Sequence, residues 1–330
     1  MQISVISPVY DAVAYVEQAV KSALDQHETA EVILIEDAST DNSLAVCEQL
    51  TQQYNRVRLL RHPEGMNRGT AASRNVGILN AKYDYIAFLD ADDFYLPARF
   101  ETASKIFSQS PFVEGVYEAT GVHFESDSAR KGWLNSPLHQ GQMITTIKEH
   151  LPPDQLFHAL VSGGGKGSFH TNAITVKRSL FLKTGLFDEC LVLHQDTVMW
   201  IKMAAVGNLV AGNINKPVAI RRIHNNNRIL HLPKGPSPYL KMMDEILTKW
   251  ASQVGLSDTQ MDLLQYRAWC NSLFNYDIYW RGEVESKAGS LITQVLRKAV
   301  FLVDTLVRSP SLMFSGYLLR FVFGALRRLV

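Results

Sequence analysis

The sequence lacks the long apolar segments that a membrane-spanning protein needs. No stretch of its 330 residues reaches the roughly 18 uninterrupted apolar residues that are required to cross a bilayer. The amino terminus also lacks a basic start followed by a long apolar run, so we expect no signal peptide. These absences predict a protein that is soluble or that attaches to a membrane surface from outside.

Cysteine and net charge are also scarce. The three cysteines, Cys47, Cys190 and Cys270, are odd in number, widely spaced and in no metal-ligand pattern. This usage indicates reduced thiols in a cytoplasmic protein. The formal net charge is +1, so nothing in the overall charge favours nucleic acid as a partner. The apolar fraction of 46% and the charged fraction of 20% are typical of a globular chain of one large domain or two ordinary ones.

Strand-like apolar runs alternate with helix-like segments in the N-terminal third of the chain. The predicted strands are residues 3–9, 31–37, 57–60 and 85–90. This alternation predicts a mostly parallel sheet with helices on both faces, in which ligands bind beyond the carboxyl ends of the strands. Polar or aromatic groups follow three of these strands, at 8–11, 36–37 and 90–93.

The middle of the chain has a more mixed pattern. Residues 112–117 and 121–124 predict a β-hairpin, and the glycine-rich segment 163–170 predicts a mobile loop. A helix is expected from near Asp196, and the pattern is helical again from about residue 236 to the end.

Three carboxylates within four positions, Asp90, Asp92 and Asp93, form the sharpest local feature. Because alternate residues of an extended strand point the same way, we expect Asp90 and Asp92 to face one site and Asp93 to point elsewhere. Hard oxygen ligands suit Mg²⁺ or Mn²⁺, which complete their shells with phosphate oxygens and water. The alternative is an acidic turn that caps a helix beginning near Pro97.

Four sequence blocks together resemble the family 2 glycosyltransferases. In order, they are ISVISPVYDA, VILIEDASTDNSL, NRGTAASRNVGILNAKYDYIAFLDADDFYLP and GLFDECLVLHQDTVMWIKMAAVG. The resemblance implies an inverting enzyme with an α/β GT-A fold, a Rossmann-like, mostly parallel sheet that binds nucleotide sugars. It implies a catalytic domain at 1–225, with a nucleotide-binding half (1–110) and an acceptor-binding half (111–225), followed by a helical C-terminal region (226–330).

The resemblance assigns residues to the nucleotide. The end of the first strand would pack against the nucleobase through Pro8, Val9 and Tyr10. Asp37 would accept a hydrogen bond from a pyrimidine nitrogen, and Glu36 stands where the family more often has Asp. Asn67 and Arg74 belong to the segment over the nucleotide, where Arg74 would bind a base carbonyl or a phosphate. From the residues alone, Asp37 could instead be an N-cap or turn residue and Arg74 an exposed arginine.

The resemblance also assigns a metal site for Mn²⁺ or Mg²⁺. Asp90 and Ala91 would lie at the ribose or at a metal-bound water, and Asp92 would coordinate the metal. His224, in RRIHNNNR, matches the segment that closes over the diphosphate and could be a second ligand, or simply a surface residue. The arginines before it could pair with phosphate, namely Arg221 or Arg222.

Asp196 matches the general base of the family, which takes the proton of the acceptor hydroxyl. The family usually has Glu-Asp here, whereas this chain has Gln195–Asp196. The alternative for Asp196 is the N-cap of the following helix. Trp200 could pack under the acceptor site, although a core position is favoured. The resemblance implies that the loop with Gly164 and Gly165 faces the acceptor side. The alternative is a phosphate-binding loop, but the segment lacks the ending of a P-loop.

The C-terminal segment 287–330 carries seven Lys or Arg residues and one acid, Asp304. On a helical projection Arg320, Arg327 and Arg328 oppose a large apolar face, which suits a helix lying in the plane of an anionic membrane. The alternative is a helix that packs on the catalytic domain or on a partner subunit. The former predicts peripheral attachment at the inner face of the cell membrane.

Together these observations predict a glycosyltransferase of the hexosyltransferase type. It would move a sugar from a nucleotide sugar, most often UDP-linked, to a hydroxyl of a surface polysaccharide, an oligosaccharide or a lipid-linked acceptor. Homo-oligomers are compatible with the sequence. A sugar-nucleotide pyrophosphorylase is a rival, but it would need a glycine-rich basic loop after the first strand. A second rival is an inactive glycosyltransferase-like subunit of a membrane assembly. The presence of Asp37, Asp92 and Asp196 argues against it.

Overall fold

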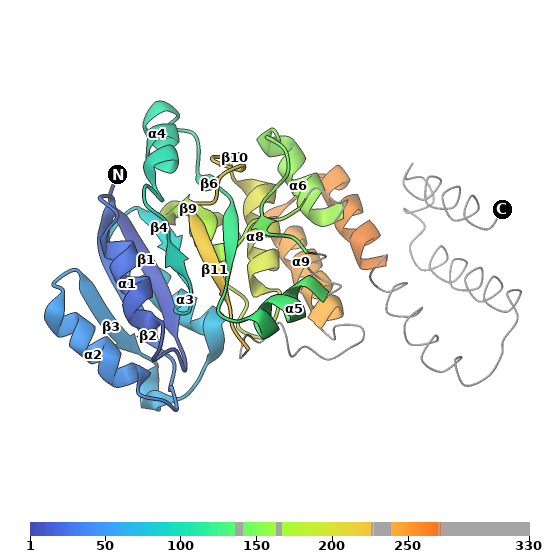
Figure 1. Ribbon diagram of the computed structural model, residues 1–330. Coiled ribbons are helices and arrows are strands. Elements are labelled where there is room, and N and C mark those ends of the chain that lie inside the picture. Colours follow the sequence, from blue (N-terminus) through green and yellow to red (C-terminus); the bar gives the residue numbers. More distant parts are fainter. Residues whose placement is uncertain (136–140, 163–166, 226, 228–238, 270, 272–330) are drawn as a thin grey trace, which may run out of the picture. The chain divides into compact units, whose positions relative to one another are not determined.

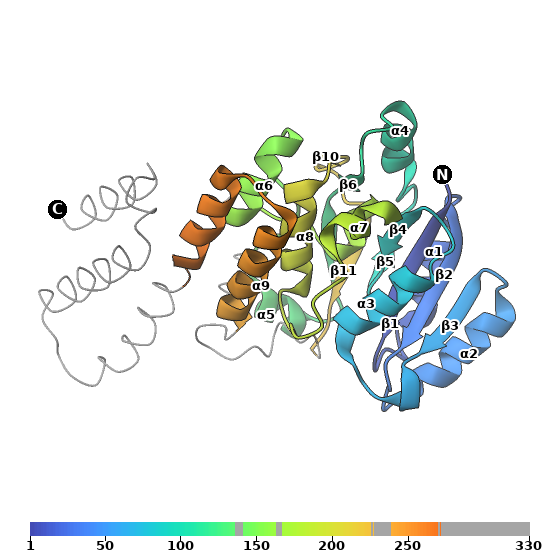
Figure 2. The same ribbon diagram turned by 180° about the vertical axis from the view of Figure 1, so that it is seen from behind.

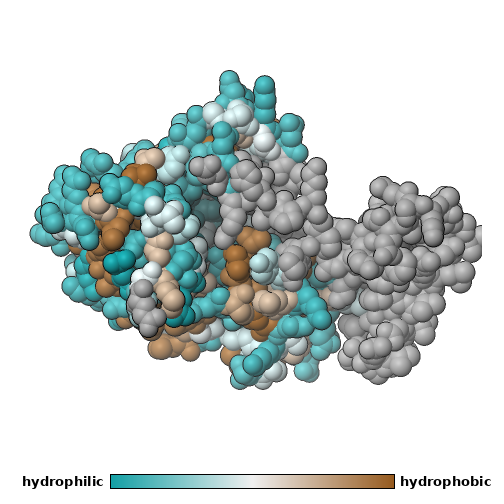
Figure 3. All heavy atoms as spheres, turned by 90° about the horizontal axis from the view of Figure 1, so that it is seen from below, coloured by the Kyte–Doolittle hydropathy of each residue, from teal (hydrophilic) through white to brown (hydrophobic). Residues whose placement is uncertain are grey.

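The computed structural model describes residues 1–135, 141–162, 167–225, 227, 239–269 and 271. The chain divides into two compact units, Met1–Pro233 and Lys234–Val330. Seen from below, the described residues present a mostly hydrophilic surface with separate apolar patches (Figure 3).

A mixed sheet forms the centre of the first unit (Figure 1). Among the described residues it has seven strands in the order β10-β6-β9-β4-β1-β2-β3. Their bounds are β1 (Ile3–Val9), β2 (Thr29–Glu36), β3 (Val57–Arg61), β4 (Tyr85–Phe88), β6 (Gly115–Tyr117), β9 (Ile174–Lys177) and β10 (Leu209–Ala211). All neighbouring strands pair in parallel except β9, which runs antiparallel to β4 and β6. The predicted mostly parallel α/β sheet is confirmed.

Helices cover both faces of this sheet. The helices α1 (Val16–Leu24) and α2 (Ser43–Gln53) cover the face that is turned to the viewer in Figure 1. The helix α3 (Gly69–Asn80) covers the opposite face, which Figure 2 shows. Val5 of β1 belongs to the core cluster that includes α1, whereas its neighbour Ile6 packs against α3. A Cβ on Gly77 would lie 2.4 Å from Ile6, so glycine is what allows α3 to approach this closely. Successive side chains of a strand point to opposite faces of the sheet. Because helices cover both faces, β1 has apolar residues on both.

A smaller sheet crosses near the carboxyl end of β4. It contains four strands in the order β5-β11-β7-β8 in the described chain. Their bounds are β5 (Phe94–Tyr95), β7 (Thr120–Phe124), β8 (Ile144–Thr145) and β11 (Ala219–Ile223). β11 pairs in parallel with β7 and antiparallel with β5.

The predicted hairpin of residues 112–117 and 121–124 is wrong. β6 and β7 follow each other in the chain but join different sheets. Between them the backbone N–H groups of Glu118 and Ala119 donate to the carbonyls of Ala173 and Asn213. These partners come from other segments, so the chain leaves one sheet and enters the other instead of turning back.

The remaining helices of the first unit are α4 (Glu101–Gln109), α5 (Asp127–Asn135), α6 (Pro153–Ser162), α7 (Phe181–Thr184) and α8 (Gln195–Val206). The helix predicted near Asp196 is thus confirmed. The helix expected to begin near Pro97 starts later, at Glu101, because Ala98 has a left-handed φ of 63° that interrupts the helical path.

The second unit is helical where it is described. The helix α9 spans Tyr239–Val254 and buries one apolar face that includes Met243, Leu247 and Trp250. Helix continues at residues 258–269, where Arg267 donates from Nε to Asp244 over 3.2 Å. Among the described residues no helix is both long and apolar enough to span a bilayer. The segment 287–330, predicted to bind a membrane, lies outside the described residues.

A fully buried arginine connects the parts of the first unit. The guanidinium of Arg99 donates to the carboxylate of Glu118 at 2.9 Å, to the carbonyl of Asn172 at 3.0 Å and to that of Ile174 at 3.2 Å. Its side chain and that of Glu118 are both 0% exposed. Burial raises the pKa of Glu118, and the charge of Arg99 offsets this only in part. The pair therefore depends on both members being present.

We expect Arg99→Met to lower the free energy of unfolding by about 3–5 kcal/mol, and the melting temperature by roughly 6–20 °C, because Glu118 stays buried without its cation. A carboxyl group whose pKa is higher in the folded than in the unfolded state stabilises the folded state at low pH. This contribution to the free energy of unfolding is lost as the pH rises. The deficit of Arg99→Met should therefore be smaller at pH 5 than at pH 8.

The double variant Arg99→Met/Glu118→Gln is the control, because the glutamine oxygen can still accept from the Asn213 N–H that Glu118 binds at 3.2 Å. It should recover part of the lost stability and lose the added pH dependence. A double variant as unstable as the single one at every pH would contradict this account.

Candidate active site

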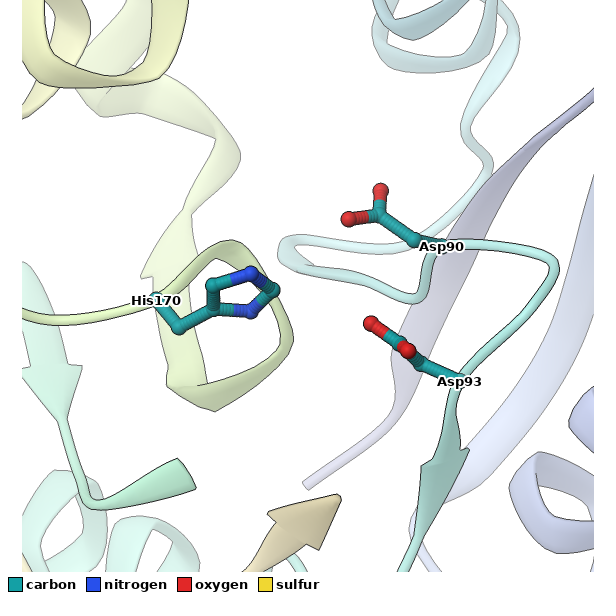
Figure 4. Close-up of side chains that lie close together, drawn as sticks. All are labelled: Asp90, Asp93 and His170. Atoms are coloured by element: carbon teal, nitrogen blue, oxygen red, sulfur yellow. The ribbon is translucent and has the colours of Figure 1, made fainter. Parts of the chain in front are cut away.

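The three acids after β4 lie in a turn and not on an extended strand. β4 ends at Phe88, and the N–H of Asp93 donates to the carbonyl of Asp90 over 3.0 Å. The alternation expected for a strand therefore does not apply. The prediction that Asp93 points away from Asp90 is wrong, since the carboxylates of Asp90 and Asp93 lie within 4.8 Å of each other and of His170 (Figure 4).

Asp93 is the buried anchor of this turn. Its residue is 3% exposed, and its two oxygens accept from the backbone N–H of Arg222 at 2.7 Å and from the side-chain amide of Asn172 at 2.5 Å. The oxygen of the same Asn172 amide accepts from the N–H of Asp90 at 3.0 Å. Burial raises the pKa of Asp93 well above its ordinary value, and the charges of Asp92 and Asp90 add to this. Its donors on two different segments hold the turn in place.

Asp90 pairs with a buried arginine. Its Oδ1 accepts from Arg74 at 2.7 Å, and the side chain of Arg74 is only 4% exposed. Burial acts to raise the pKa of Asp90, but Arg74 and His170 outweigh it and the net direction is downward. In the part of the chain that the structure describes, Nε and Nη1 of Arg74 have no hydrogen-bond partner. Buried guanidinium N–H groups without partners are what an anionic ligand would satisfy.

His170 joins the same group, although the sequence had placed it only in a glycine-rich loop. Its imidazole faces Asp90 and Asp93 in Figure 4. Burial lowers the pKa of His170 to about 4, and Arg221 adds to the shift. The neutral imidazole is therefore the prevailing form at neutral pH. No sequence signal could have brought it here, because its position depends on η2 (Thr171–Ala173), which leads into the antiparallel strand β9.

Asp92 faces a different partner from its neighbours. Its Oδ2 lies 3.1 Å from Nε2 of His224 and 3.3 Å from the amide nitrogen of Asn227. The ring of Tyr15 stacks on His224 with centroids 5.0 Å apart. The structure brings together Asp92 and His224, which are far apart in the chain.

Among the described residues, two places could hold a divalent cation, and the contacts favour the Asp92–His224 pair. Adjacent ligands of an octahedral Mg²⁺ at 2.0–2.1 Å lie about 3 Å apart, and the two atoms are separated by 3.1 Å. Among Asp90, Asp93 and His170, both oxygens of Asp93 are already bound by Asn172 and Arg222. Arg74 also sits against Asp90 and repels a cation.

The strand ends predicted to bind the nucleotide lie beside this turn. Oδ1 and Oδ2 of Asp37 accept from the N–H groups of Arg68 and Gly69 at 2.6 and 2.9 Å, so Asp37 caps the start of α3. Asn67 donates from its amide to the carbonyl of Asp37 over 2.9 Å. In the preceding strand end, Val9 is buried in the core, Pro8 is half-buried and Tyr10 is 49% exposed. Within that triplet Tyr10 offers the most side-chain surface to a base.

Asp196 lies in the first turn of α8, half-buried, and its Oδ1 accepts from the N–H of Thr197 over 2.7 Å. Its negative charge works against the lowering of the His170 pKa. Gln195 before it is buried. Trp200 is 2% exposed and packs against Phe88, Phe169 and Phe187, so its ring belongs to the core, as the sequence favoured. Gly164 and Gly165 lie outside the described residues.

The two arginines before His224 point to different partners. The guanidinium of Arg222 pairs with Glu125 and donates to Gln18 at 2.6 Å, so it is not free to bind phosphate. Arg221 lies over the ring of Trp133 at 5.2 Å and acts on the pKa of Asp90 and of His170.

Sequence comparison shows which known proteins this part of the chain resembles. Residues 4–156 match the family described as Glycosyl transferase family 2. Over 112 residues the chain is 40% identical to an uncharacterized glycosyltransferase of Haemophilus influenzae, covering 34% of this chain and 44% of that protein. Over 226 residues it is 29% identical to the chondroitin synthase of Pasteurella multocida, covering 68% of this chain and 21% of that protein. The chain thus spans less than half the length of either relative.

Solved structures share the fold. The S. aureus TarS 1–349 structure in complex with UDP-GlcNAc superposes with a TM-score of 0.63 at 16% identity, covering 83% of this chain and 73% of that one. The mannosyltransferase PcManGT of Pyrobaculum calidifontis, in complex with GDP-Man and Mn²⁺, gives a TM-score of 0.54 at 18% identity, with coverage of 96% and 85%. These similarities confirm the GT-A type of fold.

We expect Asp93→Asn to lower the free energy of unfolding by about 1–3 kcal/mol, because a buried donor is left unpaired. In either orientation the new amide NH₂ faces an N–H, that of Asn172 or that of the Arg222 backbone. Thermal unfolding of the full chain measures the loss.

Asp92→Asn is the matched control. Its side chain is 32% exposed, so water can satisfy the new amide and the melting temperature should change much less. Equal melting temperatures for Asp93→Asn and the wild type would show that the carboxylate of Asp93 does not hold the turn.

Proposed function

Because residues 4–156 belong to glycosyl transferase family 2, we propose that this chain transfers a sugar from a nucleotide-sugar donor to a hydroxyl group of a saccharide acceptor, with inversion at the anomeric carbon. One observation carries the proposal. The carboxylate of Asp92 lies 3.1 Å from the imidazole of His224, and Arg74, which pairs with Asp90 of the same turn, has buried nitrogens without a partner among the described residues. With the half-buried carboxylate of Asp196, these groups can supply the cation ligands, the phosphate donor and the general base of an inverting sugar transfer.

The donor is a UDP-sugar in this proposal. Asp37, although bound to two backbone N–H groups, keeps lone pairs that can accept from a pyrimidine ring N–H. Tyr10 is exposed at the next strand end and offers a ring for the base to pack on. The TarS structure, of the same fold, holds UDP-GlcNAc, which supports the choice of nucleotide.

The diphosphate would lie between Arg74 and a cation held by Asp92 and His224. The N–H groups on Nε and Nη1 of Arg74 can bind phosphate oxygens. Bound Mn²⁺ or Mg²⁺ would neutralise the charge that develops on the leaving diphosphate. The Mn²⁺ in the PcManGT complex supports a cation in this fold.

Asp196 is the proposed general base. As the acceptor oxygen bonds to the anomeric carbon, the bond from that carbon to the phosphate oxygen breaks on the opposite face, and the acceptor proton passes to Asp196. Its place in the first turn of α8 favours the ionised carboxylate, because the helix N-terminus is positive. His170, neutral at pH 7, would lie between this base and Asp90 and could donate a hydrogen bond to the donor sugar.

The acceptor is proposed to be a surface polysaccharide, an oligosaccharide or a lipid-linked saccharide. The similarity to a chondroitin synthase, the name of a polysaccharide-forming enzyme, supports this class. Attachment of residues 287–330 to the inner face of the cell membrane is part of the same proposal. The proposal also includes a division of the chain into a catalytic domain (1–225), which has two halves, and a helical region (226–330).

We expect Asp196→Asn to lower kcat for sugar transfer by roughly 10²–10⁴-fold, the usual contribution of a general base. The amide keeps the shape and still accepts from Thr197, so UDP should bind with unchanged affinity. Transfer is measured as UDP release from UDP-sugars in the presence of saccharide acceptors.

Asp84→Asn is the control, since the Asp84 side chain is 90% exposed at the start of β4. It should retain full activity. Wild-type rates in Asp196→Asn would exclude Asp196 as the base, and UDP binding without transfer by the wild type on any saccharide would favour the inactive subunit.

We expect Mn²⁺ to tighten UDP binding by at least about tenfold, or 1.4 kcal/mol, in the wild type, because the cation bridges Asp92, His224 and the diphosphate. Asp92→Ala should lose this gain and keep the metal-free affinity. Calorimetric titration of UDP with and without Mn²⁺ measures both. If Mn²⁺ tightened UDP binding equally in Asp92→Ala, the cation would have to bind elsewhere, for example at Asp90, Asp93 and His170.

A further inference from the structure

Arg222 lies next to Asp92 and His224, the two predicted metal ligands. It lies on β11, and its side chain is 8% exposed. Nη1 binds the carboxylate of Glu125 at the end of β7, and Nη2 donates to Gln18 of α1 at 2.6 Å. The guanidinium carbon also lies 5.0 Å from the ring centre of Tyr15. Partners from separate elements thus fix its orientation.

This arginine contacts Asp92 directly and is linked to His224 through the ring of Tyr15. Its Nε donates to the backbone carbonyl of Asp92 over 2.8 Å, which holds the residue that carries one ligand atom. Its guanidinium lies over the ring of Tyr15. That ring in turn stacks on the imidazole of His224 at an interplanar angle of 28°. Its own backbone N–H binds Asp93, the anchor of the same turn.

We propose that Arg222 is a positioning residue that keeps Asp92 and His224 at the separation a divalent cation requires. This inference rests on the proposed function, since it concerns the same cation. The 3.1 Å between the carboxylate and the imidazole depends on the turn, which Arg222 holds through two hydrogen bonds, and on the imidazole, which it supports through Tyr15. Groups that orient metal ligands commonly change metal affinity by 10–100-fold when they are lost.

The charge of Arg222 is neutralised away from the site. Glu125 takes one side of the guanidinium, and its own side chain is 33% exposed. An arginine that bound phosphate directly would keep N–H groups free, as Arg74 does. Arg222 therefore acts on the cation through the ligands that it orients.

The experiment compares Mn²⁺ binding by the full chain in the presence of saturating UDP. Free Mn²⁺ is measured from its electron paramagnetic resonance signal, which does not require turnover. We expect Arg222→Met to raise the dissociation constant of Mn²⁺ by about 10-fold or more. Arg222→Lys should fall between it and the wild type, because a lysine cannot bind Glu125, Gln18 and the Asp92 carbonyl at once.

Transfer kinetics provide a second measurement that a general loss of structure would not reproduce. In Arg222→Met the Mn²⁺ concentration for half-maximal rate should rise, while kcat at saturating Mn²⁺ stays within about threefold of the wild type, because the side chain does not touch the reacting atoms.

Arg58→Met is the matched control for losing a buried ion pair. Arg58 binds the buried Glu31 at 2.7 Å, near the amino ends of β1 and β2, where Ser4 also contacts Glu31. This variant should lose stability and bind Mn²⁺ like the wild type. If Arg222→Met does not fold, Tyr15→Leu and Gln18→Ala each remove one of its contacts and should weaken Mn²⁺ binding by a smaller factor.

The outcomes separate the two proposals. Wild-type Mn²⁺ affinity in folded Arg222→Met, or in both substitute variants, overturns the role of Arg222 and leaves the proposed function intact. A wild-type chain in which UDP does not promote Mn²⁺ binding at all overturns the metal-dependent function, and the role of Arg222 with it.

Discussion

The buried carboxylate of Asp93 is the constraint on which the site depends. A buried charge is tolerated only when donors satisfy it, and here the donors come from both sheets of the first unit. Arg222 belongs to β11 of the smaller sheet, and Asn172 lies in η2, next to β9 of the larger one. Satisfying the two oxygens of this carboxyl group therefore joins the two sheets at the carboxyl end of β4. The positions of Asp90 and Asp92 follow from this, since both lie in the turn that Asp93 anchors.

The dense negative charge after β4 is divided among different partners. Asp90 is paired with the buried Arg74, and Asp93 is held by neutral donors. Asp92 alone faces His224 with a side chain that is one-third exposed, at 32%. Like charges so close together would repel each other strongly if they shared one environment. Because each carboxylate has its own compensation, the cluster can exist without a cation and still leave Asp92 able to bind one.

Local patterns predicted much of the parallel half of the fold. The strands at 3–9 and 31–37 could be recognised because both of their faces are apolar, and the helix near Asp196 because of its spacing. The same local reasoning failed for the segment 112–124. Its two strands look like a hairpin, yet the buried pair of Arg99 and Glu118 accompanies a crossing from one sheet to the other. A partner that lies far away in the chain leaves no trace in the local pattern.

The sequence by itself indicated a resemblance to the family 2 glycosyltransferases, the strands that carry polar ends, and the candidate residues Asp37, Asp92 and Asp196. These features are readable because they depend on residue type and on spacing along the chain. Only the tertiary structure decided that His170 joins Asp90 and Asp93, and that the guanidinium of Arg222 pairs with Glu125. Both results arise where β9 and β11 pack beside the end of β4. Such contacts depend on how strands pair across the sheets, which no local stretch of sequence specifies.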